Sequence, residues 1–159
     1  MSPKPMKRAV FFLTIIFFSN LAGMYYNMYL TWWFDMIHHF MGGFFVAMLM
    51  VYYLSDMVTR DKPPEASLAK GGRQVPKIKS YLVIVGAVTF IGVVWEFAEY
   101  LASQTLIEPL YKYFQIKAYF IGELDDTIND LLMDILGALS WLLGSRFQTI
   151  IKLRTSKMR

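Results

Sequence analysis

The chain has 159 residues, of which 56% are hydrophobic and only 18% are charged, and its mean hydropathy is +0.39. Soluble domains carry about 25% charged residues, so this composition excludes an ordinary soluble protein and indicates an integral membrane protein. The net charge is +4, and the chain has no cysteine, which excludes disulfides, thiolate metal ligands and cysteine nucleophiles.

Apolar runs long enough to cross a bilayer occur at about 9–30, 34–55, 80–103 and 127–145. Each span needs roughly 20 apolar residues, so four spans and their connections use nearly the whole chain. We therefore expect an all-α fold, in which residues 1–159 form a single integral membrane domain, a polytopic bundle of four transmembrane helices. The first run is longer than the apolar region of a signal peptide, which favours a mature helix.

Lys and Arg are concentrated before the first span, in the 56–79 loop and after the last span, and only Lys112 and Lys117 lie elsewhere. By the positive-inside rule both termini are cytoplasmic (N-in/C-in), the 56–79 loop is cytoplasmic and the 104–124 loop is outside. We expect a multi-pass protein of the cell membrane. Its basic tail favours contact with anionic lipid headgroups over binding of nucleic acid.

The outer 104–124 loop is apolar and aromatic, so we expect it to lie at the membrane interface, where a short amphipathic helix could cover a site. Aromatic residues also gather near the outer ends of the first two spans and are typical of an interfacial belt. Glycines recur within the spans and predict close helix packing. These glycines are Gly42, Gly43, Gly86, Gly92, Gly137 and Gly144.

Ionisable residues occur within three of the spans, always towards the predicted outer side. They open the second span, close the third and open the fourth, and helices rise about 1.5 Å per residue, so all three sets reach one layer roughly 10 Å deep. Asn27 in the first span has a suitable depth to add a neutral polar edge, together with Asn20. Charged groups inside a bilayer are costly unless they face one another, water or a metal, so this layer is a candidate functional site.

Seven of the twelve acids and both histidines fall in this layer. So many carboxylates cannot all stay ionised in a low dielectric, so either several have raised pKa values or cations neutralise them, and bound metal is the simpler explanation. The sequence therefore predicts a site for a divalent metal ion, and oxygen and imidazole ligands suit Mg, Mn, Fe or Zn. The candidate metal ligands are Asp35, His38, His39, Glu96, Glu99, Asp126, Asp130 and Asp134.

Some of these residues also have structural interpretations. Asp125 lies where a helix N-terminus needs a cap, so we expect it to cap the last helix rather than bind metal. Neighbouring residues on a helix point about 100° apart, so only one of His38 and His39 is expected to ligate directly, and we favour His38. Asn129 suits an interhelical hydrogen bond as well as a ligand role.

Three sequence blocks carry a family resemblance. They are Asp35-x-x-His38-His39-Phe40, Trp95-Glu96-Phe97-x-Glu99-Tyr100 and Asp126-Thr127-x-x-Asp130-x-x-x-Asp134-x-x-Gly137-Ala138. They resemble the blocks of YjdF-like bacterial membrane proteins, and the resemblance covers spans two to four. More loosely the chain is similar to VanZ-like proteins, which are linked to glycopeptide resistance, although Met36 stands where their Asp-Lys-x-x-His motif has lysine. The resemblance implies a polar membrane pocket without an established reaction.

Three functional classes follow from this layer. The cation could act on a lipid or lipid-linked substrate, with Glu96 or Asp130 as the catalytic general base. The cluster could instead be the ion site of a cation or proton transporter, although the inner halves of the spans contain nothing ionisable, which argues against a path through one protomer. The third class is a non-catalytic structural or sensory core, recognised by full mutual hydrogen bonding. Enzymatic turnover and homo-oligomerisation both stay open.

Overall fold

The computed structural model describes residues 4–54, 77–118, 120 and 124–156. They form helices and connecting turns, with no strand in these ranges. The long helices are α1 (Lys4–Tyr25), α2 (Trp32–Tyr53), α5 (Lys77–Thr105) and α7 (Leu124–Ser156), and the short ones are the 3-10 helix η1 (Met28–Leu30) and α6 (Ile107–Phe114). The four long helices are each long and apolar enough to cross a membrane, which confirms the expected fold class.

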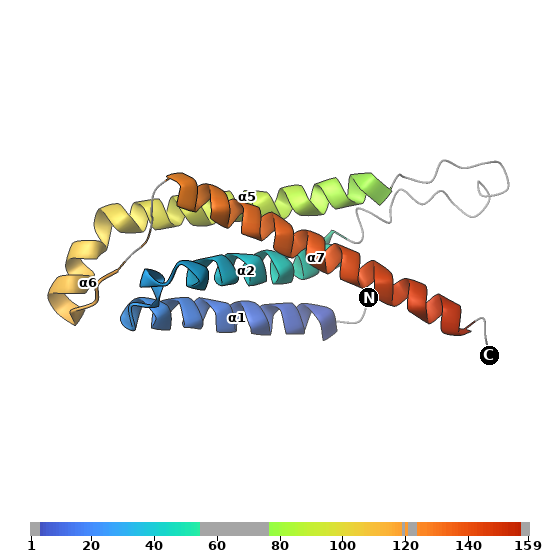
Figure 1. Ribbon diagram of the computed structural model, residues 1–159, viewed down its shortest axis with the longest axis horizontal. Helices are drawn as coiled ribbons and strands as arrows, with labels where there is room; N and C mark the ends of the chain where they lie inside the picture. Colours follow the sequence, from blue (N-terminus) through green and yellow to red (C-terminus); the bar gives the residue numbers. More distant parts are fainter. Residues whose placement is uncertain (1–3, 55–76, 119, 121–123, 157–159) are drawn as a thin grey trace.

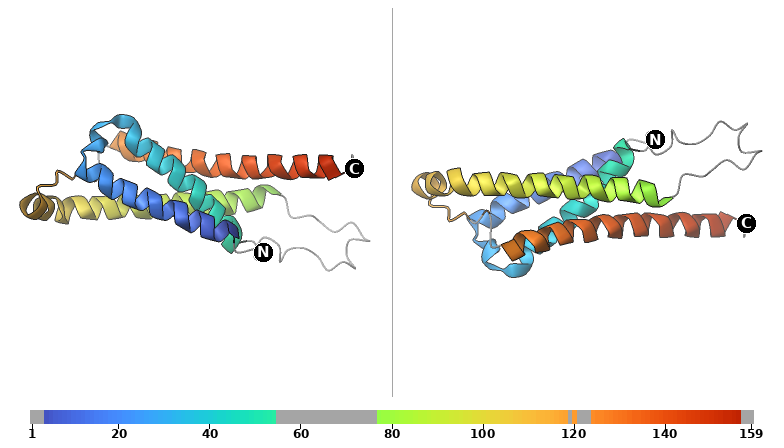
Figure 2. Two further views of the ribbon diagram at one scale, coloured as in Figure 1. Left: turned by 90° about the horizontal axis from the view of Figure 1, so that it is seen from below. Right: turned by 90° about the horizontal axis from the view of Figure 1, so that it is seen from above.

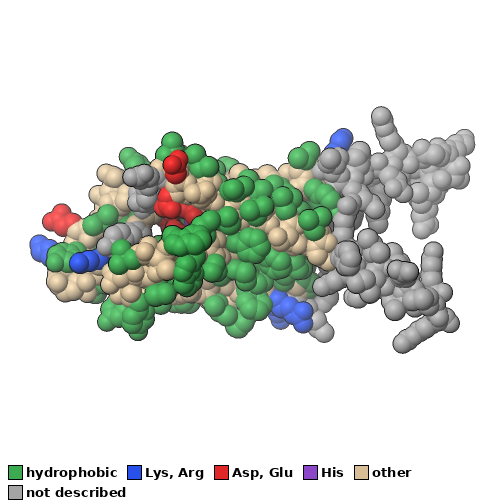
Figure 3. All heavy atoms as spheres, viewed as in Figure 1, with side chains coloured by type: hydrophobic (Ala, Val, Ile, Leu, Met, Phe, Trp, Pro, Cys, Tyr) green, Lys and Arg blue, Asp and Glu red, His purple; other side chains and the backbone are tan. Residues whose placement is uncertain are grey.

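Helix α2 is the centre of the bundle and contacts α1, α5 and α7. Helix α1 packs on one side of α2 and α7 on the other, while α5 packs against both α2 and α7 (Figures 1 and 2). Helix α1 begins and α7 ends at one end of the bundle, and α6 lies at the other, which we call the α6 end. Hydrophobic side chains cover most of the middle of the face in Figure 3, as lipid contact requires.

The first helix ends earlier than the apolar run predicts. Helix α1 stops at Tyr25, and Asn27 then takes a left-handed conformation with φ 54° before η1 begins. Asparagine tolerates this backbone better than most residues, so it can turn the chain sharply towards α2. At the other end of the chain, α7 continues to Ser156, beyond the predicted limit at 145. The predicted 56–79 loop lies, up to residue 76, outside the described residues.

Two glycines allow α2 and α7 to cross with their backbones in contact. A Cβ added at Gly43 would overlap the backbone of Asp134, and one at Gly137 would overlap the backbone of Phe40 and Phe44. This close crossing confirms the packing role predicted for these two positions. At Gly86 and Gly144, by contrast, an added Cβ would meet no described atom within 4 Å, so the described residues show no close helix contact there.

Away from the α6 end, the helices enclose an apolar core. Ala47 from α2, Ile84 and Val88 from α5, and Ala138 and Leu142 from α7 are all buried there. A second apolar cluster joins α1 to α2, with Ala9, Phe45 and Met48 at its centre. The buried polar and charged residues that remain lie nearer the α6 end.

Candidate metal centre

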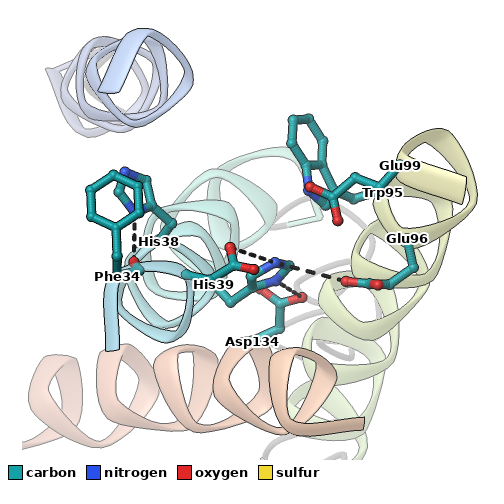
Figure 4. A network of polar contacts seen from close by, with 8 residues as sticks. Phe34, His38, His39, Trp95, Glu96, Glu99 and Asp134 are labelled. Carbon is teal, nitrogen blue, oxygen red and sulfur yellow. Dashed lines mark hydrogen bonds and ion pairs between the residues drawn. The ribbon is translucent and has the colours of Figure 1, made fainter. Parts of the chain in front are cut away.

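His39 lies at the middle of a group of acids contributed by three helices. Its Nε2 atom is 3.7 Å from Asp35 Oδ1 and 3.8 Å from Glu96 Oε1, and its Nδ1 atom is 3.5 Å from Asp134 Oδ2 (Figure 4). Asp35 stands one helical turn before His39 on α2, whereas Glu96 comes from α5 and Asp134 from α7. The imidazole therefore has a carboxylate on each of its nitrogen edges.

Two further acids complete this group. Ligand atoms of Asp35, His39 and Asp130 lie within 4.8 Å of one another, and so do those of His39, Glu96 and Glu99. We call the set Asp35, His39, Glu96, Glu99, Asp130 and Asp134 the His39 centre. Its members stand roughly 5 to 15 Å along their helices from the α6 end, given a rise of about 1.5 Å per residue. The acids of separate spans thus meet at a common depth.

Burial in the His39 centre is deep, and hydrogen bonding is incomplete. The exposed fraction is 7% for Glu96 and 2% for Asp130, yet Glu96 Oε1, Asp130 Oδ1 and Asp35 Oδ1 are all buried without a hydrogen-bond partner. Among the described residues, every ion pair of these acids is with His39, and none is with Lys or Arg. One imidazole can balance only one ionised carboxylate, so any further ionised acid in the centre needs positive charge from another source.

His38 faces away from this centre. Its Nδ1–H donates to the Phe34 carbonyl oxygen at 2.8 Å, and its Nε2 lies 3.0 Å from Ser19 Oγ on α1 (Figure 4). A carbonyl oxygen only accepts, so the proton is on Nδ1, and Nε2 accepts from the serine hydroxyl. The structure therefore brings His39, and not the favoured His38, to the acids, because the face of α2 that packs on α7 carries His39.

The acids at the beginning of α7 are not enclosed. Asp125 and Asp126 are both exposed in the first turn of the helix, where a negative charge stabilises the positive end of the helix dipole. Asp126 was a candidate ligand, but it is not part of either close ligand group. Of the three acids spaced along this helix, Asp130 and Asp134 enter the centre, because one and two further turns carry them below the surface.

Gly92 makes room for Asp134. A Cβ added at Gly92 would overlap Oδ2 of Asp134 and come within 3.2 Å of Leu131 Cδ2. The carboxylate therefore reaches His39 through the space that a side chain on α5 would otherwise fill. Trp95, one turn along the same helix, donates its Nε1–H to Glu99 Oε1 at 2.8 Å and so fixes that carboxylate.

Tyr29 is one of the aromatic residues near the outer end of the first span that were expected in an interfacial belt, but the structure places its hydroxyl beside the centre. The hydroxyl oxygen is buried beside the side chain of Asn20, and the ring packs edge-on against Phe34. Burial raises the pKa of the Tyr29 phenol above its ordinary value, and the nearby charges of Asp35 and Glu99 raise it further. The group therefore stays a hydrogen-bond donor. Tyr29 lies within η1, and nothing in its sequence position distinguished it from the other aromatic residues at this end.

Asn20, rather than Asn27, is the asparagine that faces inward. Asn27 is exposed at the turn after α1, whereas Asn20 is buried, with 9% of its surface exposed. Asn20 lines a cavity of about 250 Å³ that His39 and Asp134 also line. The cavity thus lies directly against the His39 centre, and most of its other lining residues are apolar.

Comparisons with known proteins give one match. A family model described as "Predicted membrane protein (DUF2238)" matches residues 5–149, which is most of the chain. YjdF-like proteins are this family, so that resemblance is confirmed, and with four membrane-spanning helices the chain is a multi-pass membrane protein. No curated protein matches the chain, and no solved structure matches it.

Proposed function

The chain belongs to the DUF2238 family of predicted membrane proteins, and we propose that it binds a divalent cation at the His39 centre. One observation carries the proposal: three buried carboxylate oxygens, from Asp35, Glu96 and Asp130, have no hydrogen-bond partner and surround a single imidazole. Burying an ionised carboxylate in the low dielectric of a protein interior costs several kcal/mol when no partner compensates for the lost water. A divalent cation among them supplies the missing positive charge.

The direct ligands in this proposal are His39 Nε2, Asp35, Glu96 and Asp130. Two ligands that each lie about 2.1 Å from a metal are about 3.0 to 3.5 Å apart at octahedral or tetrahedral angles. The 3.7 and 3.8 Å separations of His39 Nε2 from the two carboxylate oxygens are close to that range. Small side-chain movements therefore suffice to close the site around an ion.

Asp134 has a different role, as the positioning partner of His39. Its carboxylate faces Nδ1, so it favours a proton on that nitrogen and leaves the Nε2 lone pair for the metal. Metal-bound histidines commonly donate their second nitrogen to a carboxylate in this way. A mixed imidazole and carboxylate set suits Mn, Fe or Zn, and also Mg when waters complete its shell.

The function that this site supports best is metal-assisted chemistry on a lipid or lipid-linked substrate. A bound cation can polarise a phosphoryl or acyl oxygen or activate a water molecule. Glu96 and Asp130 are the candidates for general base, since the acid that is displaced from the metal when substrate binds can accept a proton. The looser likeness to VanZ-like proteins is part of this proposal and supports it only through their Asp-x-x-His start.

Two other functions have less support. A transporter needs a route to the far side, but the buried residues beyond the centre are Ala47, Ile84, Val88, Ala138 and Leu142, which offer an ion no ligand. A purely structural core would satisfy its own polar groups, whereas the His39 centre leaves carboxylate oxygens without partners.

Measuring the metal content of the purified full chain tests the proposal. His39→Ala is the test variant, and His38→Ala, at the neighbouring histidine, is its control. We expect the wild type and His38→Ala to retain a divalent cation after dialysis, and His39→Ala to lose it, with an affinity lower by more than about 100-fold. Equal metal content in the two variants, or none in the wild type, would refute the site. Uptake of the same cation into proteoliposomes would instead favour transport.

The predicted orientation places the His39 centre near the outer face. The chain has no cysteine, so single cysteines can be introduced without background. We expect an impermeant maleimide added outside cells to label a cysteine at the exposed Tyr113 and not one at the exposed Lys7. The opposite pattern would place the centre at the cytoplasmic face.

A further inference from the structure

The cavity beside the His39 centre is a groove between three helices. Helix α1 packs on α2, whereas α5 packs on α2 and α7, so the space between α1 and α5 has α2 as its floor. Figure 4 shows Trp95 extending from α5 into this space. Since α1 and α5 both cross the membrane, the groove lies at bilayer depth, beside lipid chains rather than bulk water.

The lining follows one pattern on all three helices. The groove is lined from Leu13 to Asn20 on α1, from His38 to Val46 on α2 and from Val88 to Trp95 on α5, and α7 adds Asp134 beside the His39 centre. On α1 and α5 the lining residues are at positions i, i+3, i+4 and i+7, and on α2 His39, Gly42, Gly43 and Val46 have the same spacing with His38 beside them, so each set forms a single helical face. Each stripe is about 10 Å long, since the helical rise is about 1.5 Å per residue.

The stripes also share a polarity. Their polar members all lie towards the α6 end, and their other ends are Leu13, Val46 and Val88. These polar members are Asn20, His38, His39 and Trp95. The groove is therefore apolar where it runs deepest into the bundle and polar where it meets the His39 centre. That distribution matches an amphiphile that lies along the helices with its head at the centre.

We propose that this groove binds one hydrocarbon chain of a phosphate-bearing lipid, and that the phosphate contacts the cation held at the His39 centre. The inference rests on the proposed function, because without a cation the carboxylates would repel a phosphate. A divalent cation bound by carboxylates commonly takes substrate phosphate oxygens as further ligands. Trp95 and Asn20 line the groove where the chain joins its headgroup.

The glycine on the floor of the groove offers a way to fill it. A Cβ added at Gly42 would have only Asp134 Oδ1 nearby, at 3.8 Å, so a side chain fits there and projects into the groove. Gly86 is its control, since an added Cβ meets no described atom within 4 Å and the residue does not line the groove. A second pair is Ile91, which lines the groove and is 39% exposed, and Val94, which does not line it and is 51% exposed.

The test uses the full chain in nanodiscs of phosphatidylcholine with a minority of phosphatidic acid and Mn²⁺. After transfer to detergent and washing, retained lipid is measured by mass spectrometry and retained metal in the same sample. We expect the wild type to retain phosphatidic acid in preference to phosphatidylcholine. Gly42→Leu and Ile91→Trp should lower that retention about tenfold or more while keeping the metal, and Gly86→Leu and Val94→Trp should change neither.

Removing the cation with EDTA should lower retention of phosphatidic acid about tenfold, since the phosphate loses its ligand. Equal retention in Ile91→Trp and Val94→Trp, or no preference for phosphatidic acid in a protein that holds metal, would overturn the groove inference and leave the cation site standing. Retained lipid in a protein that binds no metal would overturn the cation site instead. Retention that EDTA does not change would overturn the contact between phosphate and cation.

Discussion

Near the α6 end of the bundle, helices α2, α5 and α7 enclose His39, Glu96 and Asp130, and eight residues further along the same helices they enclose Ala47, Val88 and Ala138. That step is about 12 Å along a helix. The second set belongs to a closed apolar core, whereas the first leaves carboxylate oxygens without partners. The same three helices thus form a closed apolar core in one half of the bundle and a group of buried carboxylates without partners in the other.

The contrast between these regions has a functional consequence. In the apolar core, packing alone satisfies the side chains, so nothing else needs to bind. In the His39 centre, buried carboxylate oxygens have no hydrogen-bond partner, and Asn20, His39 and Asp134 also line the neighbouring groove. Ligand is therefore expected to reach the centre sideways from the bilayer or from its own surface, and not through the apolar half.

The largest expected effect comes from removing an acid that only the cation would neutralise. Asp130→Asn should weaken cation binding by more than about 100-fold, as measured by calorimetry. Without cation, the same variant should have a free energy of unfolding about 1 to 3 kcal/mol higher than the wild type, because the substitution removes a buried charge that has no partner. It should therefore also unfold at a higher temperature.

Asp126→Asn is the control for that variant, because Asp126 lies one turn earlier on the same helix and is exposed. It should leave both cation affinity and stability nearly unchanged. If the cation-free Asp130→Asn protein were less stable than the wild type, the Asp130 carboxylate would form a stabilising contact within the protein. The His39 centre would then satisfy its own polar groups, as the apolar core does.

Asp134→Asn should have the next largest effect. The carboxylate orients His39 without binding the metal itself in our proposal, and loss of such a partner typically costs about 10- to 100-fold in metal affinity. Calorimetric titration with Mn²⁺ or Zn²⁺ measures it. A loss as complete as that of His39→Ala would make Asp134 a direct ligand.

In the apolar half, overpacking should change stability and not binding. Ala47 is fully buried against Ile84 and Val88, so Ala47→Leu should cost about 1 to 3 kcal/mol in thermal unfolding. Cation affinity should stay at the wild-type value, and Ala22→Leu at an exposed position should alter neither quantity. Weakened cation binding in Ala47→Leu would show that the two halves are coupled.

The smallest effect is expected at Tyr29. Its buried hydroxyl interacts only weakly with the neutral Asn20 side chain, so Tyr29→Phe should change the stability of the cation-free protein by less than about 1 kcal/mol. A cost that appears only after cation is added would show that the phenol donates to a group bound at the centre. Tyr25→Phe, at a residue that is 63% exposed, should be silent in both states.

Hydropathy and charge spacing were enough to predict the four spans, their order and the layer of acids, because the cost of placing polar groups in lipid acts on every residue separately. The depth of Asp35, Glu96 and Asp130 follows from the same counting along each helix. The acids of separate spans could therefore be expected to meet before any contact between helices was known.

Rotation of the helices about their own axes could not be obtained in this way. Sequence favoured His38, but Gly43 and Gly137 let α2 cross α7 closely on the side that carries His39, and Ser19 holds His38 towards α1. Tyr29 was also unforeseen, because its position depends on the turn at Asn27.

The sequence by itself determined that this is a four-span membrane protein with ionisable residues gathered near one face, since transfer to lipid is an additive property of single side chains. Only the tertiary structure decided which of those side chains share a centre, which carboxylates lack partners and where the apolar groove meets them. Those features depend on where the helices cross and how each is rotated about its axis. Close backbone contacts at Gly43 and Gly137 set that crossing, and they form only when two helices meet.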